Sequence, residues 1–281
     1  GILADLSTQL TLNNTLVTGN TASSGGGIFI LKPETSVTLN QGSRITNNTA
    51  NDSDPTTVEQ GGGIFSNGIL TVFDGTLSGN LSTGKGGALA NFGTANLQRT
   101  TIHNNNAIVE AGGIQNAGNL TLTNATISNN GKYGIHIAGP AYATNVTLSG
   151  NTLANIYTVS SSISLKNSAL AHALGGVNCI GTMLSIVSAG SNLSSDASCA
   201  FANTGDWNNT DPLLGSLADN GGLTQTMLPL TGSPLRETGA SAGAPPTDQR
   251  GLPRPSGAAV DIGAVEVQVT LVRVYIPITM K

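Results

Sequence analysis

Residues that could do acid–base or metal chemistry are few in this chain and widely scattered. The 281 residues include 15 Asp plus Glu, 11 Lys plus Arg and 3 His. The densest acidic group, Asp52, Asp54, Glu59 and Asp74, could bind a cation weakly but lacks the Asp-x-Asp-x-Asp-Gly pattern of a dedicated calcium loop. No Asp or Glu occurs from 111 to 195. Acid–base cleavage of a glycan needs paired carboxylates, so the sequence predicts neither a catalytic nor a metal site.

The histidines do not supply the missing chemistry. His103, His136 and His172 fall at non-equivalent positions of the repeat described below, so they cannot form a stacked triad. We expect all three to be solvated surface residues. With no cofactor motif either, the chain is predicted not to be an enzyme and to need no cofactor.

Composition excludes two classes of partner. Only 9% of the residues are charged, where an ordinary soluble domain has about 25%. A net charge of −4 leaves no basic field for nucleic acid. No apolar run reaches the roughly 18 residues that a membrane-spanning helix needs. Polarity comes instead from Thr, Ser, Asn and 37 Gly, which favour strands and turns over helices.

Two cysteines, Cys179 and Cys199, lie in a stretch with loop-like composition. An even number of cysteines in a chain of low charge favours an oxidising, extracellular compartment and a disulfide. Such a bridge would stabilise the loop by about 3 kcal/mol. Two unrelated free thiols are the alternative, and no further Cys or His stands at metal-ligand spacing.

A repeat of 21 to 32 residues organises the first part of the chain. Three apolar landmarks recur in constant order, each within a run that alternates with Thr, Ser or Asn at period two, as strands do. The first landmark falls at Ile2, Ile28, Ile64, Ala88, Ile114, Ile135 and Ile156; the second at Leu12, Leu39, Val72, Leu97, Leu122, Ala143 and Leu165; the third at Val17, Ile45, Leu77, Ile102, Ile127, Leu148 and Leu170. Periods of this size predict a solenoid.

Stacking the repeats at the strand spacing of about 4.8 Å makes a column of about seven coils. An asparagine recurs at the turn after the third strand, where stacked amides can hydrogen-bond one another along the column as Asn ladders do. Its positions are Asn20, Asn48, Asn80, Asn105, Asn130 and Asn151.

The Gly-Gly-Ile, Leu-x-Leu and Thr-Ile-Ser-Asn-Asn elements resemble a right-handed parallel β-helix of the pectate-lyase-like superfamily, over residues 1–175. Motifs farther on, such as Asn209-Thr210-Asp211-Pro212-Leu213-Leu214-Gly215 and Asp261-Ile262-Gly263-Ala264-Val265-Glu266, resemble the choice-of-anchor Q family of exported bacterial proteins. The fold class expected is therefore all-β, with an extracellular or cell-surface location.

The resemblance divides the chain into coils over 1–175, a C-terminal cap over 176–266 with a disulfide, and a strand tail over 267–281. A solenoid end exposes apolar side chains and unpaired strand edges, which a cap covers. We expect the charges of the cap to fix its loops by hydrogen bonds and ion pairs rather than to form a catalytic cluster. Trp207 is expected to cover the end of the column.

The two ends of the chain predict self-assembly. Gly1-Ile2 stands in the register of Gly113-Ile114, so we expect a first coil that is nearly whole and has an open edge. The tail alternates apolar and polar residues and then shifts phase by one, which indicates a bulge or two strands. The expected assembly residues are Ile2, Leu10, Leu12 and Val17 in the first coil, and Val267, Val269, Leu271, Val274, Ile276 and Ile278 in the tail.

We therefore expect a non-catalytic, exported surface protein whose copies pack head to tail into a filament or stalk. In the alternative, the tail folds back on its own column or serves as an attachment signal. A second function class is an adhesin or carbohydrate-binding module that contacts surface polysaccharide, and a third is a relative of polysaccharide lyases or hydrolases. The binding hypothesis rests on two outward rows of hydroxyls: Thr76, Thr101, Thr126 and Thr147, and Thr11, Thr38, Thr71 and Thr121.

Overall fold

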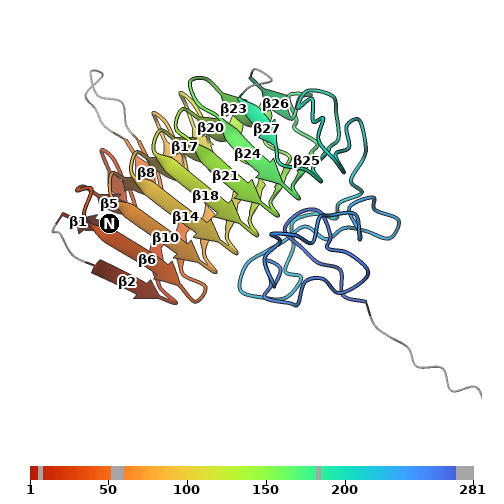
Figure 1. Cartoon of the computed structure of the whole chain (residues 1–281). Coiled ribbons are helices and arrows are strands. Elements are labelled where there is room, and N and C mark those ends of the chain that lie inside the picture. Colours follow the sequence, from red (N-terminus) through yellow and green to blue (C-terminus); the bar gives the residue numbers. More distant parts are fainter. Residues whose placement is uncertain (6–8, 52–59, 182–184, 270–281) are drawn as a thin grey trace, which may run out of the picture.

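The protein is a parallel β-solenoid of about seven turns (Figure 1). A computed structural model describes residues 1–5, 9–51, 60–181 and 185–269, and all of the regular elements in these ranges are strands. Each turn of the chain adds one strand to each of three parallel sheets, here called sheets A, B and C. The first four turns add a strand to a fourth sheet, sheet D.

The strands of each sheet follow one another along the column. Sheet A consists of β1 (Ile2–Ala4), β5 (Ile28–Ile30), β9 (Ile64–Ser66), β13 (Leu89–Asn91), β17 (Ile114–Asn116), β20 (Tyr133–Ile137), β23 (Ala154–Thr158) and β26 (Cys179–Ile180). Sheet B consists of β2 (Gln9–Asn13), β6 (Ser36–Asn40), β10 (Ile69–Phe73), β14 (Thr94–Gln98), β18 (Asn119–Thr123), β21 (Ala141–Thr144), β24 (Ile163–Lys166) and β27 (Ile186–Ser188).

Sheet C consists of β3 (Leu16–Thr18), β7 (Arg44–Thr46), β11 (Thr76–Ser78), β15 (Thr101–His103), β19 (Thr126–Ser128), β22 (Thr147–Ser149), β25 (Ala169–Ala171) and β28 (Leu193–Ser194). Sheet D consists of β4 (Thr21–Ala22), β8 (Thr49–Ala50), β12 (Leu81–Ser82) and β16 (Asn106–Ala107).

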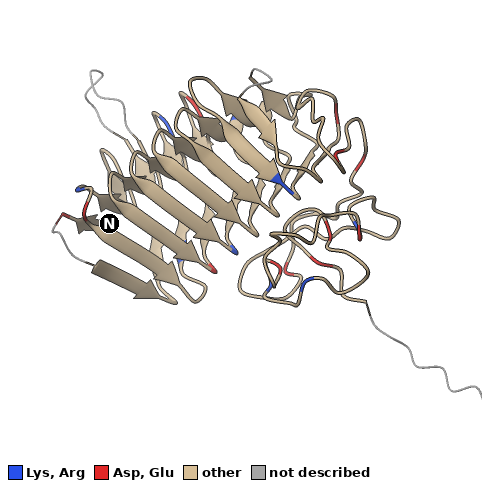
Figure 2. Cartoon of the chain, in the orientation of Figure 1, with Lys and Arg blue, Asp and Glu red and all other residues tan. Residues whose placement is uncertain are grey.

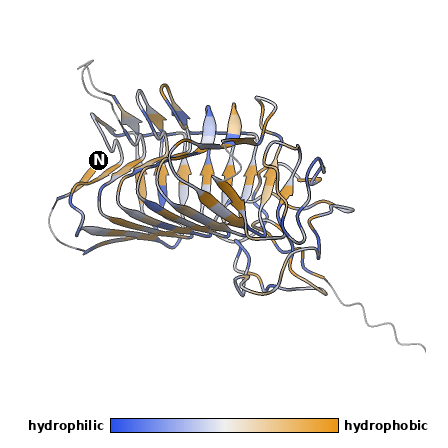
Figure 3. Cartoon of the chain, turned by 45° about the horizontal axis from the view of Figure 1, so that its top comes forward, coloured by the Kyte–Doolittle hydropathy of each residue, from blue (hydrophilic) through white to orange (hydrophobic). Residues whose placement is uncertain are grey.

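The interior is a stack of aliphatic side chains in register. Leu39, Val72 and Leu97 pair through the middle of sheet B, and each is buried. Hydrophobic colour accordingly gathers on the strands (Figure 3). The predicted register of the second and third landmarks is confirmed throughout.

One position of the first landmark is wrong. Leu89, not Ala88, pairs with Ile64 and Ile114. Ala88 instead occupies the place that Gly63 has in the preceding turn of the chain, so the apolar strand residue comes one position later. Beside it, Gly62 lies so close to the next coil that an added Cβ would be 2.3 Å from the carbonyl oxygen of Leu81. Glycine allows that close backbone approach.

The predicted asparagine ladder is confirmed. Asn48 donates from its backbone N–H and from Nδ2 to Oδ1 of Asn80, at 3.0 and 3.1 Å, and Asn80 repeats both bonds to Asn105. The same double contact joins Asn105 to Asn130 and Asn130 to Asn151. Because these amides are buried, the ladder satisfies backbone groups that water cannot reach.

The column continues past the predicted boundary at residue 175, because β26, β27 and β28 extend all three main sheets. The disulfide between Cys179 and Cys199 is present, with 4.9 Å between the Cα atoms. Both cysteines join the column core together with Phe201. Trp207 pairs in parallel with Leu193 of β28, so residues 196–209 close this end of the column.

Residues 210–269, here called the lateral module, lie beside the column rather than on its end (Figure 1). Thr126 donates its hydroxyl to Oε1 of the buried Gln249 at 2.7 Å, and Thr147 accepts the backbone N–H of Ala264 at 3.0 Å. The sequence predicted a cap of the column end over 176–266; the structure corrects this, because only the first part closes the end. The lateral module is instead held by hydroxyl groups on the outer face of sheet C.

The ladder leads to a prediction for stability. Asn105→Ala removes one buried rung, including the donor to Asn130 and the acceptor for Asn80, and should lower the free energy of unfolding by about 3 kcal/mol. Asn20→Ala, at the solvated end of the same ladder, should lower it by less than about 1 kcal/mol. Chemical denaturation of both variants measures the difference. Equal losses of unfolding free energy in the two variants would contradict a ladder whose buried rungs contribute more stability than its solvated end.

Candidate functional site

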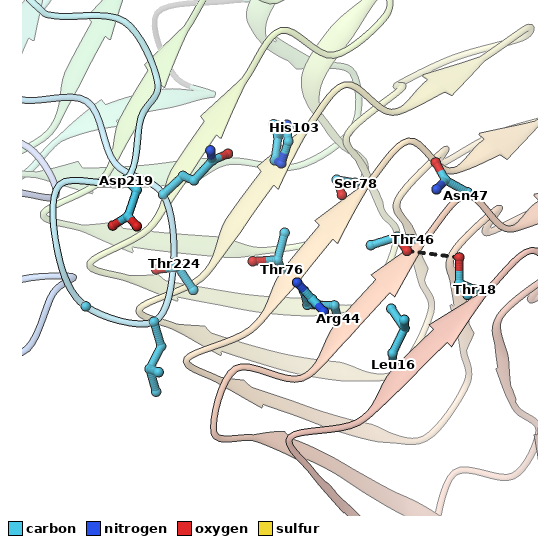
Figure 4. A pocket seen from close by; sticks show the side chains of 13 residues that line it. Leu16, Thr18, Arg44, Thr46, Asn47, Thr76, Ser78, His103, Asp219 and Thr224 are labelled. Carbon is cyan, nitrogen blue, oxygen red and sulfur yellow. Dashed lines mark hydrogen bonds between the residues drawn. The ribbon is translucent and has the colours of Figure 1, made fainter.

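On the outside of the column, one hollow is bordered by sheet C and another by sheet A. The lateral cleft, of about 610 Å³, lies between sheet C and the 219–225 loop of the lateral module (Figure 4). The aromatic groove, of about 400 Å³, lies over sheet A and includes Lys85, Phe92, Glu110, His136 and Tyr157. Volumes of this order suit small ligands or part of a polymer.

The lateral cleft is lined mainly by neutral polar groups. Thr46 donates its hydroxyl to Thr18 at 3.1 Å along the sheet, as Figure 4 shows. Arg44 is exposed and forms no ion pair among the described residues, and Asp219 faces the column from the module. Burial lowers the pKa of His103, whose Nδ1 has no hydrogen-bond partner within the described part of the chain. Among the described residues, no carboxylate forms an ion pair with this imidazole.

The aromatic groove contains a connected set of ionisable groups. Lys85 Nζ lies 2.9 Å from Glu110 Oε1, and Glu110 Oε2 lies 2.6 Å from His136 Nδ1. The same ring nitrogen lies 2.5 Å from Oε1 of Gln115. Because Oε1 of Gln115 can only accept, we assign the proton of the neutral imidazole to Nδ1, which donates to Gln115 with Glu110 Oε2 close by.

The prediction that His136 is a solvated surface residue is wrong, because it is only 4% exposed. The Tyr157 ring stacks on it at 4.9 Å with an interplanar angle of 12°, and Nε2 has no partner among the described residues. Burial lowers the pKa of His136, and the nearby Glu110 carboxylate offsets this effect in part. The signal for this cluster was present in the repeat, since Gln115, His136 and Tyr157 occupy one outward position of three successive coils.

Of the acidic residues considered for cation binding, the structure describes Asp74 alone. Asp74 is engaged by Arg99, which donates from Nε to Oδ1 at 2.7 Å and lies over the Phe73 ring. Asp52, Asp54 and Glu59 lie outside the described residues. Within the described ranges, no three His, Cys, Asp or Glu side chains form a group that could hold a metal ion.

The buried charges of the lateral module fix its loops. Asp248 binds the Arg250 side chain at 2.9 Å and accepts the backbone N–H of Glu266. Arg254 donates to the carbonyl oxygen of Asp261 at 2.7 Å and lies 3.4 Å from Glu266. Burial lowers the pKa of Arg254 and raises the pKa values of Asp261 and Glu266. Their partners are mostly backbone groups, which is the arrangement of a structural network. Charges are correspondingly denser in the module than on the column (Figure 2).

Of the predicted assembly residues in the first coil, Ile2, Leu10 and Leu12 are only partly buried, and Val17 is buried. In the tail, Val267 is partly buried and Val269 is exposed. The remaining tail residues of that prediction lie outside the described residues: Leu271, Val274, Ile276 and Ile278.

The two hydroxyl rows have different environments. Thr76, Thr101, Thr126 and Thr147 do share one position of sheet C, but the last three are buried under the lateral module. That row is therefore a docking surface for the chain's own module. The sheet B row remains accessible; it contains Thr11, Thr38, Thr71 and Thr121.

Comparisons with family models, with curated proteins and with solved structures give no match to this chain. The structure thus establishes a β-helix without assigning it to a family. Among the described residues, no helix is long and apolar enough to span a membrane.

The buried imidazole leads to a pH prediction. Because burial lowers the folded-state pKa of His136, the unfolded chain takes up a proton first as the pH falls below the ordinary value of 6.5. The stability contributed by the neutral imidazole is complete above 6.5 and declines below it. Denaturation curves between neutral and mildly acidic pH should show this decline, and His136→Gln should reduce its slope.

His172→Gln is the matched control, since His172 is exposed on the outside of a turn. It should leave the pH slope as in the unmodified protein. A slope that His136→Gln leaves unchanged would contradict the assignment of a buried neutral imidazole.

Proposed function

We propose that this protein is a non-catalytic, exported structural β-helix whose copies assemble head to tail. The observation that carries the proposal is the difference between the two ends of the described column. At one end, the disulfide, Phe201 and Trp207 cover the last coil. At the other, β1, β2, β3 and β4 are the last strands of their sheets, and the apolar residues Ile2, Leu10 and Leu12 are only partly buried.

The apolar residues at this second end are less covered than their counterparts one coil farther on. Leu12 pairs with Leu39 and Leu10 with Val37, yet Leu39 and Val37 are fully buried and the two leucines are not. A further coil, or a strand from a second molecule, would complete their burial and satisfy the free edges of the sheets.

The edge also has a concave feature that suits strand addition. Gly1, Ile2, Leu3 and Gly25 contribute to a hollow of about 440 Å³ that Phe29 borders. Leu3 is 63% exposed beside it. An apolar segment that alternates at period two could place side chains here while its backbone pairs with β1. The tail 267–281 has this alternating sequence pattern, and in the proposal it is the segment of one molecule that pairs with β1 of the next.

The exported location belongs to the same proposal. It is supported by the disulfide, which is typical of oxidising compartments, and by the motifs that resemble choice-of-anchor Q proteins of the pectate-lyase-like superfamily. The non-catalytic assignment is supported by Glu110, the carboxylate nearest to a histidine in the groove, which is already paired with Lys85.

Assembly predicts a dependence on concentration. The purified chain of residues 1–281 should show rising mass by light scattering as its concentration increases, and negative-stain electron microscopy should show filaments one column wide. Removal of residues 270–281 should abolish them if the tail is the connecting strand. Monodisperse particles at all concentrations would contradict the proposal.

A charge placed at the open end of the column should also abolish assembly. Leu12→Glu places a carboxylate on the interface and should abolish assembly, because burying an unpaired charge is unfavourable by several kcal/mol. Ile108→Glu is the matched control: Ile108 is exposed just after β16, in the middle of the column. It should assemble as the unmodified chain does. Loss of assembly in the control, or its persistence in Leu12→Glu, would contradict the assigned interface.

A further inference from the structure

Two sets of neighbouring aromatic rings lie along the aromatic groove on the outside of sheet A. Phe29, Phe65 and Phe92 follow one another with ring centroids 4.9 and 5.5 Å apart. Farther along the column, Tyr133 and Tyr157 lie 4.6 Å apart, and Tyr157 stacks on His136. Phe92 is 42% exposed. These rings lie outside the aliphatic interior, so they offer apolar faces that the column core does not use.

The floor of the groove between the rings is polar. Gln115 and His136 occupy successive outward positions of β17 and β20, and Tyr157 follows on β23. The Gln115 side chain accepts from His136 through Oε1. Glu110 stands at the side of this floor with part of its carboxylate exposed. The groove thus alternates apolar faces with hydrogen-bonding groups.

The charges of the groove cancel. Lys85 is paired with Glu110, and burial keeps the His136 imidazole neutral at pH 7. Lys132, on a neighbouring turn, donates to the carbonyl oxygens of Ile108 and Val109. The groove therefore presents no unpaired cation among its described residues, and a polyanion would gain no ion pair there. An uncharged ligand that combines apolar faces with hydroxyls fits better.

The shape of the groove favours a polymer over a compact molecule. Its floor crosses successive strands, and parallel strands lie about 4.8 Å apart, which is comparable to one sugar unit of an extended glycan. Each successive sugar ring of the ligand can therefore contact the next coil of the column. The C–H faces of a pyranose ring pack on aromatic side chains, and its hydroxyls can both donate and accept.

We propose that the aromatic groove binds a neutral polysaccharide along the column axis. Sugar rings pack on Phe92 and Tyr157, and hydroxyls bond to Glu110 and Gln115. This binding does not depend on head-to-tail assembly, because the groove lies over sheet A and its polar floor begins beyond the first coils.

Affinity electrophoresis tests the proposal with three soluble polymers in the gel: mixed-linkage β-glucan, galactomannan and polygalacturonate. At least one neutral polymer should retard the protein, and polygalacturonate should retard it less. Phe92→Ala and Tyr157→Ala should each weaken the retardation at least about tenfold in apparent dissociation constant. Because Phe92 is partly exposed, its variant keeps the column core intact, which circular dichroism verifies.

Tyr142→Ala is the matched control, since Tyr142 is a 62% exposed aromatic residue on the outer face of sheet B. It should bind as the unmodified protein does. The non-assembling Leu12→Glu variant should also retain binding, which separates this proposal from the assembly proposal. Absence of retardation by both neutral polymers, stronger retardation by polygalacturonate, or unchanged binding in Phe92→Ala would overturn it.

Discussion

The structure depends on one constraint: each side chain lies directly over its counterpart in the next coil. For the interior leucines and isoleucines, this stacking buries apolar surface on all sides. For the asparagines after the third strand, it lets one amide accept two hydrogen bonds from the next, as between Asn80 and Asn105. The ladder then continues through Asn155 to Asn178. A residue type that tolerates its own copy as a neighbour is therefore required at nearly every position.

That requirement explains why the chain has so few charges. Like charges at neighbouring positions of a parallel sheet repel, whereas Thr, Ser and Asn can pair with copies of themselves. Some of the charges on the column are paired between coils, such as Asp74 with Arg99 and Lys85 with Glu110. The lateral module is not a stack, and it holds a denser network of ion pairs and charged hydrogen bonds. The column is therefore poor in charged residues because its coils stack, and the lateral module is richer in them because it does not.

The same constraint decides what the sequence could predict. Landmark spacing predicted the register of sheets B and C, and the recurring asparagine predicted the ladder, because both are local patterns repeated at a fixed period. It could not predict where residues 210–269 dock. Contacts such as Thr126 with Gln249 join residues more than a hundred positions apart and have no periodic signal. The burial of His136 has no signal in the positions of the other histidines; it follows from Gln115 and Tyr157, which share its coil position in the neighbouring coils.

The central claim is that buried stacking of like residues holds the column together, and native-state hydrogen exchange tests it most directly. The backbone N–H groups of Asn48, Asn80 and Asn105 donate to side-chain amides inside the column. These amides should exchange as slowly as the strand amides of β10 and β14, only through global unfolding. Exchange much faster than that of these strand amides would contradict the account.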